Sequence, residues 1–208
     1  MTTEASPWKA FVAIGILALL LVSAAVYQSW KNQRVIAQNR YNGFDFAEAQ
    51  GGLWVTRIQV GSQPYDIPFY HHPRELEGIV VRDHDADDLL TRANRTVRQV
   101  YLSVDPDAGA KVAAIAGVEI ARIAGSKYDL LNLPTTGALT RPANVTVEYP
   151  ILTCEDATNE TVVIQLAPDP TANAIVRNGN CVILFYRNAD DAIRVADRYA
   201  YMLLGIMP

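Results

Sequence analysis

Residues 97–125 read VRQVYLSVDPDAGAKVAAIAGVEIARIAG and carry the clearest structural pattern in the chain. The part before Asp105 is rich in the β-branched and aromatic residues typical of a strand. The following Ala, Val and Ile residues predict a helix, with Asp105 as its N-cap, Pro106 in its first turn and Gly125 after its last turn. A further apolar run, YDLLNLP at 128–134, predicts another strand. This order indicates a βαβ crossover with the helix packed on a sheet.

A β-hairpin is expected upstream of this unit. The segments LWVTRIQV (53–60) and YDIPFYHH (65–72) flank the turn sequence GSQP and place apolar residues at alternating positions. Pro68 suggests that the second strand is an edge strand, because proline cannot donate to a central ladder. EGIVV (77–81) predicts a further strand, and the acids that open DADDLLTRAN (85–94) predict a short helix.

Downstream, three strand-like runs precede a closing helix. The runs are NVTVEYPILTC (144–154), ETVVIQLAP (160–168) and NAIVRNGNCVILFYR (173–187). We therefore expect a mixed α+β fold, in which an amino-terminal transmembrane helix is followed by one mixed-sheet domain with a carboxyl-terminal helix packed on the sheet.

The closing helix carries both of its end signals. Asn188 is the expected cap, Asp190 and Asp191 suit the first turn, and Gly205 ends the helix. The stripe that would cover the sheet consists of Ile193, Ala196, Ala200 and Leu203.

An uncharged run, Ala10 to Trp30, has the length of a membrane-spanning helix. Aromatic and basic residues flank it, as is typical at membrane interfaces: Trp8, Lys9, Tyr27, Trp30 and Lys31. The alternative is a cleaved signal peptide, with Ser23 and Ala25 before the cut. The flanks favour a retained anchor. The expected organisation is a short tail (1–9), a transmembrane helix (10–30), a juxtamembrane helix or stalk (31–50) and an extracytoplasmic α/β domain (51–208).

The orientation of this anchor is open to two interpretations. Lys31, Arg34 and Arg40 outnumber Lys9, which by the positive-inside rule favours a cytoplasmic domain. Three Asn-x-Thr sequons and a pair of cysteines favour an external domain. The candidate glycosylation sites are Asn94, Asn144 and Asn159. We expect the domain to lie outside the cytoplasm.

Cys154 and Cys181 are the only cysteines in the chain. They lack the spacing and the neighbouring histidine of a zinc site. The adjacent Glu155 and Asp156 disfavour a reactive thiolate. A structural disulfide between neighbouring strands is the favoured interpretation, and two free buried cysteines, a catalytic thiol and a metal site are the alternatives.

The histidines and acids give a weaker signal. His84 lies among acids in the most metal-like patch of the chain, but this patch lacks the glycine and glutamate of a calcium-binding loop. His71 and His72 would point to opposite faces of a strand and so could not easily share one ion. Motifs for serine hydrolases, nucleotide binding and metalloproteases are absent from the sequence. No catalytic residue, cofactor or metal is therefore expected, and a net charge of −4 does not suggest nucleic-acid binding.

Several stretches resemble an uncharacterised family of single-pass, membrane-anchored archaeal proteins. They are FYHHPRELEGI, VYLSVDP, LTCEDATNETVVI and NGNCVILFYRNADDAIRVADRYAYMLLGIM, together with the single anchor. The resemblance implies an archaeal cell surface and a paired role for Cys154 and Cys181. It implies no activity or ligand.

The favoured function is a membrane-tethered, non-catalytic extracytoplasmic module, a structural or interaction subunit of an envelope or membrane complex. Its partners would be the lipid bilayer, through residues 10–30, and other membrane or envelope proteins. The alternatives are an extracytoplasmic ligand-binding protein or enzyme that uses the region around His84, and a pilin-like filament subunit.

Overall fold

The computed structural model describes residues 7–82, 86–90, 96–107, 110–144 and 147–208. The chain divides into two compact units, residues 1–40 and residues 41–208 (the head). A mixed α+β head after an apolar amino-terminal helix confirms the expected fold class.

The amino-terminal unit consists of one continuous helix, α1 (Pro7–Gln38). The helix therefore runs through the uncharged segment and onward beyond Lys31, as expected for a juxtamembrane extension. It ends shortly before Asn42 and Gly43, whose φ angles of 44° and 87° are incompatible with a continuing helix. The head begins at Tyr41, earlier than the expected boundary at residue 51, because the segment after the turn already forms a strand of the head.

The head begins with a small antiparallel sheet of β1 (Phe46–Glu48), β2 (Trp54–Val60) and β3 (Gln63–Phe69), in that order. The expected hairpin is confirmed: β2 and β3 join through a tight turn in which Gly61 has a φ of 59°. Pro68 lies on β3, an edge strand, as predicted. The alternating apolar residues share one face, on which Ile67 and Phe69 are fully buried.

A second sheet has six strands in the order β4-β8-β9-β7-β5-β6, and only β8 and β9 pair in antiparallel fashion. The strands are β4 (Val80–Val81), β5 (Gln99–Val104), β6 (Thr135–Leu139), β7 (Thr161–Pro168), β8 (Ala174–Asn178) and β9 (Cys181–Tyr186). The run at 173–187 is thus a hairpin rather than one strand, and Gly179, with a φ of 59°, occupies its turn.

The βαβ unit consists of β5, α2 (Ala110–Ala124) and β6, with β5 and β6 paired in parallel. Its second strand begins later than expected: residues 128–134 form a loop, because Asp129 and Asn132 have φ angles of 52° and 54°. Most of the following segment, PTTGALT (134–140), is strand β6.

Three local expectations were wrong. Asp105 does not cap α2 but accepts a hydrogen bond from the backbone N–H of Asp107, which closes a local turn. Residues 86–90, within the expected short helix, form turns. The described residues of the expected strand at 144–154 make only a single bridge, between Ile151 and Leu139.

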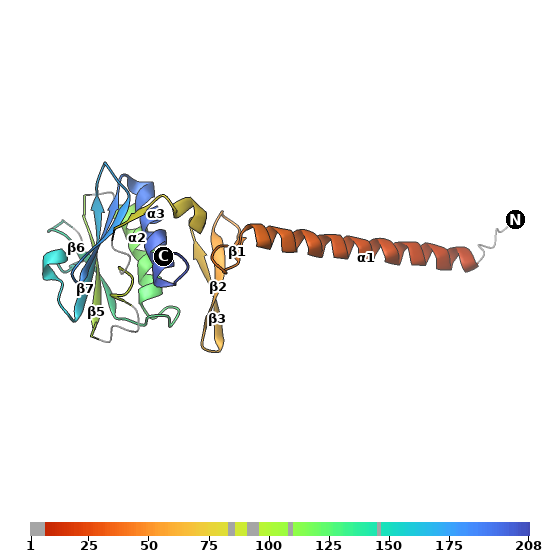
Figure 1. The fold of residues 1–208 in the computed structure, drawn as a ribbon, viewed down its shortest axis with the longest axis horizontal. Helices are drawn as coiled ribbons and strands as arrows, with labels where there is room; N and C mark the ends of the chain where they lie inside the picture. Colours follow the sequence, from red (N-terminus) through yellow and green to blue (C-terminus); the bar gives the residue numbers. More distant parts are fainter. Residues whose placement is uncertain (1–6, 83–85, 91–95, 108–109, 145–146) are drawn as a thin grey trace. The chain divides into compact units, whose positions relative to one another are not determined.

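The closing helix, α3 (Ala189–Leu203), is capped by Asn188 as predicted, and Gly205 follows it with a φ of 66°. Helices α2 and α3 pack side by side between the two sheets (Figure 1). Of the expected stripe of α3, Ala196, Ala200 and Leu203 belong to the core, whereas Ile193 is only half-buried and does not. The helix is also covered on its other side, where Tyr201 packs against Phe46 and Phe69 of the small sheet. A short 3₁₀ helix, η1 (Pro73–Leu76), also contacts α3.

Gly125 provides a test of how α2 ends. A Cβ atom at this position would lie 2.7 Å from the backbone oxygen of Ala121. Gly125→Ala should therefore lower the free energy of unfolding by about 1–3 kcal/mol, because the backbone must shift to relieve the contact. Urea unfolding of the full chain in detergent measures the change.

Gly117→Ala is the matched control in the same helix, since a Cβ there meets no atom within 4 Å. It should raise stability by about 0.5–1 kcal/mol through helix propensity. Equal effects of the two substitutions would contradict the steric explanation.

Candidate functional site

Cys154 and Cys181 form a disulfide, with their Cα atoms 5.3 Å apart. Cys181 begins β9 and is fully buried, whereas Cys154 lies in a short 3₁₀ helix, η2 (Cys154–Asp156), where its backbone N–H donates to the side chain of Gln165. The bond ties the η2 segment to the sheet, on the face opposite the helices. Neither sulfur is available as a nucleophile or as a metal ligand in this form.

The sequons fall partly within the described residues. Asn144 and Asn159 are exposed, as a glycan acceptor must be, and Asn159 accepts a hydrogen bond from Asn180. Asn94 lies outside the described residues.

The acidic patch around His84 is also outside the described part of the chain, except for Asp87 and Asp88, which lie in the turns at 86–90. Among the described residues, no group of three or more histidine, cysteine, aspartate or glutamate side chains could hold a metal ion. His71 and His72 enter different environments, as expected. His72 packs among the rings of Tyr41, Phe46 and Trp54, whereas His71 contacts α3.

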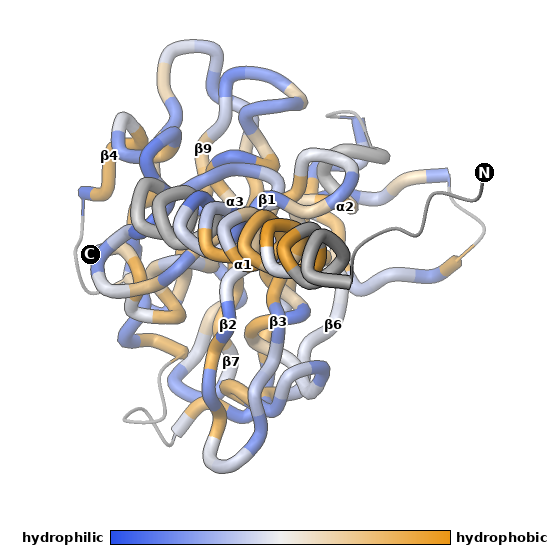
Figure 2. The backbone as a smooth tube through the Cα atoms, turned by 90° about the vertical axis from the view of Figure 1, so that its right-hand side faces the viewer, coloured by the Kyte–Doolittle hydropathy of each residue, from blue (hydrophilic) through white to orange (hydrophobic). Residues whose placement is uncertain are grey.

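Helix α1 contains the one segment in the described residues, Ile14–Lys31, that is long and apolar enough to cross a membrane, and none of that segment is buried. Figure 2 shows the hydrophobic residues along it. Of the expected interface residues, Tyr27, Trp30 and Lys31 are exposed. The side chains of Trp8 and Lys9 lie outside those described.

The most unusual chemistry of the head is a buried cluster of four ionisable residues, His71, Glu119, Arg122 and Asp197. On α2, Glu119 accepts a hydrogen bond from the guanidinium group of Arg122, and its carboxyl group also interacts with that of Asp197 on α3. Oδ2 of Asp197 accepts from the backbone N–H of His71 at 3.0 Å and lies 2.9 Å from its Nδ1. The guanidinium carbon of Arg122 lies 4.8 Å from the centre of the Phe69 ring.

Burial determines the electrostatics of this cluster. Burial, with a smaller contribution from the neighbouring Asp197, raises the pKa of Glu119 to about 8 against the opposing effect of Arg122. Burial also raises the pKa of Asp197, although its contacts with His71 lower it. At neutral pH, therefore, the Glu119 carboxyl is mostly protonated.

Sequence reasoning missed this cluster. His71 was considered only for a metal site, and the other three residues were not singled out. The available signal was local: Glu119 and Arg122 interrupt an otherwise apolar helix, and Asp197 follows the buried Ala196 in α3. Nothing in the sequence linked α2 to α3, so the pairing itself required the fold.

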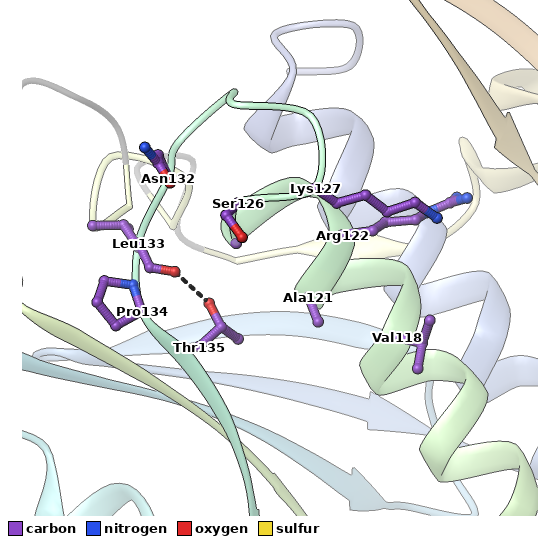
Figure 3. Close-up of a pocket in the computed structure, with 10 residues that line it drawn as sticks. Val118, Ala121, Arg122, Ser126, Lys127, Asn132, Leu133, Pro134 and Thr135 are labelled. Atoms are coloured by element: carbon purple, nitrogen blue, oxygen red, sulfur yellow. Dashed lines mark hydrogen bonds between the residues drawn. The ribbon is translucent and has the colours of Figure 1, made fainter.

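Two cavities lie along α2, on the side of β6. One, of about 510 Å³, contains Arg122, Ser126, Lys127 and Thr135 in its lining. Arg122 and Lys127 extend in the same direction, away from Thr135 (Figure 3), so its cations do not converge with its hydroxyl groups. The geometry does not resemble an anion site.

The second cavity, of about 460 Å³, is lined mostly by apolar and small residues of α2, β5 and β6. Val118 lies between the two cavities and is 59% exposed, and Tyr149 borders the second and is 43% exposed. We call the surface of this second cavity, with Val118 and Tyr149 at its border, the α2–β6 groove. Strand β6 forms an edge of the sheet, and in the described chain only the bridge to Ile151 extends the sheet beyond it.

Comparisons with protein-family models, with curated proteins and with solved structures find no match to this chain.

The raised pKa of Glu119 predicts how stability depends on pH. Its pKa is about 8 in the folded state and near 4.5 when unfolded, so its stabilising contribution is complete below about pH 4.5 and is lost as the pH rises through about 8. The glutamine of Glu119→Gln cannot ionise, so the free energy of unfolding of this variant should decline less than that of the wild type as the pH rises. Urea unfolding across this pH range measures it.

Asp66→Asn is the control, because Asp66 is an exposed acid whose pKa is lowered by its hydrogen bond to Arg57. It should leave the decline between about pH 5 and about pH 8 unchanged. A wild-type chain with constant stability over this range would refute the prediction.

Proposed function

We propose that this chain is a membrane-tethered, non-catalytic extracytoplasmic module that serves as a structural or interaction subunit of a cell-envelope or membrane complex. The observation that carries the proposal is α1, whose apolar segment is unburied and matches the thickness of a bilayer. Water would strongly disfavour such a helix, so the bilayer is its natural environment.

The external location draws its support from the head. A disulfide persists mainly in oxidising compartments, and Cys154 and Cys181 form one. The exposed Asn144 and Asn159 are suitable glycan acceptors. The opposite topology is favoured by the basic residues Lys31, Arg34 and Arg40. We give more weight to the disulfide and to the exposed asparagines of the head than to these three charges. The archaeal cell surface implied by the family resemblance is the setting that we propose.

The interaction role draws its support from the α2–β6 groove. Exposed apolar side chains border it, and it adjoins an open edge of the sheet, which is a combination typical of surfaces that bind other proteins. We propose that another membrane or envelope protein contacts the head here. A non-catalytic role is favoured because neither Glu119 nor Asp197 lines either of the two cavities described above.

Mass spectrometry of the native, membrane-extracted chain tests the topology. We expect Cys154 and Cys181 to resist alkylation until they are reduced, and at least one of Asn94, Asn144 and Asn159 to carry a glycan. Free thiols together with bare asparagines would place the head in the cytoplasm and overturn the external assignment.

Substitution of Val118 tests the interaction surface. Val118→Lys places a charge in the groove and should reduce the size of the native complex in mild detergent, because a partner would have to bury that charge. Val80→Lys on β4 is the control, since Val80 is also exposed, at 53%, but does not line the groove. A complex of unchanged size for Val118→Lys, or an equal loss for both variants, would contradict the assignment.

A further inference from the structure

His71, which lies just after the small sheet, makes several polar contacts with α3. Oδ2 of Asp197 lies within hydrogen-bonding distance of both the backbone nitrogen and Nδ1 of His71, and the backbone oxygen of His71 accepts a 2.8 Å hydrogen bond from the hydroxyl of Tyr201. Since His71 follows β3 closely, these contacts hold the β3 end of the sheet against the helical layer.

The second oxygen of the same carboxyl has an unusual environment. Oδ1 of Asp197 is buried, and no N–H or hydroxyl group of the described residues donates a hydrogen bond to it. The carboxyl group of Glu119 interacts with the Asp197 side chain, and two carboxylates cannot hydrogen-bond to each other. A proton must therefore lie between them, with the Glu119 carboxyl as donor and Asp197 Oδ1 as acceptor.

The charges of the cluster lead to the same assignment. With Glu119 protonated, the positive Arg122 lies close enough to the negative Asp197 to lower the pKa of Asp197. Removing that proton would add a second negative charge beside Asp197 in a buried cluster, which is costly.

We propose that the proton shared by Glu119 and Asp197 acts as a latch that holds the small sheet, β1–β3, on the helical layer and releases it reversibly when the proton is lost. Ionisation of Glu119 places two negative carboxylates in contact, and their repulsion disturbs the carboxyl group on which His71 depends. The ionisable groups that face this pair are Arg122 from α2, Tyr201 from α3, His71 from the end of β3 and Glu75 from η1.

The latch has a route to solvent. The side chain of Asp197 is fully buried, whereas that of His71 is 20% exposed and contacts it directly. Protons can thus reach the buried pair through the imidazole without global unfolding. In the chain, the small sheet is the first element of the head after α1, so the latch would control how firmly the part nearest the anchor is joined to the rest of the head.

Hydrogen exchange of the full chain in detergent, corrected for the intrinsic effect of pH, tests the latch. Protection of the β3 and η1 amides should fall about tenfold to a hundredfold between about pH 6 and about pH 9, while β7 and β9 stay protected. The Glu119→Gln variant keeps a hydrogen-bond donor towards Asp197 but has no proton that titrates. In this variant, the protection of the β3 and η1 amides should therefore not change with pH.

Asp66→Asn is the matched control within the small sheet and should behave as the wild type, because its exposed ion pair with Arg57 lies outside the cluster. Constant protection in the wild type, or the same decline in Glu119→Gln, would overturn the proposal. If Glu119→Gln does not fold, carboxyl ¹³C titration of the wild type decides, since the absence of any glutamate that titrates near pH 8 would also overturn it. None of these measurements depends on membrane topology or on a partner.

Discussion

The carboxyl group of Asp197 has no exposed surface, and it lies on a helix that is covered on both sides. A buried acid must find hydrogen-bond donors inside the protein, which restricts the positions of its neighbours. Here the backbone N–H of His71, just after β3, donates to the carboxyl group and Glu119 of α2 lies beside it, so a single carboxyl relates the small sheet, α2 and α3 to one another. Tyr201 adds apolar contacts with Phe46 and Phe69 at this junction, and the cluster adds directional contacts.

Periodicity and end signals were sufficient for much of the fold. The hairpin at 53–72, the strand before Asp105 and the closing helix after Asn188 all follow local rules that the structure obeys. The failures share a cause. YDLLNLP (128–134) and the segment at 144–154 are as apolar as strands, but the first is a loop and the described part of the second lies mostly outside the sheet. Local hydrophobicity does not report strand pairing, and in the second segment it does not report burial either, since Val147 and Ile151 are exposed.

Prediction of the individual sites from the sequence also succeeded where the signal was local and failed where it depended on tertiary contacts. The pairing of Cys154 with Cys181 was accessible because the chain has only two cysteines and both adjoin strand-like runs. Glu119 and Asp197 were not, since each is an ordinary acid in its own helix and acquires its unusual pKa only when α2 and α3 pack together. A charge in an apolar helical run is a hint that a sequence offers, but its partner depends on tertiary contacts.

The central place of α3 also determines when the head can fold during synthesis. Its residues Val195, Tyr199 and Tyr201 are fully buried between sheets whose strands all precede it in the chain. Until the ribosome has released this helix, both sheets have an uncovered apolar face, and the parallel pairing of β5, β7 and β9 spans long stretches of chain. Helix α1 precedes the head in the chain, so it is synthesised while the head is still open. The nascent head is therefore an incomplete domain with exposed apolar surface, which makes it a substrate for chaperones.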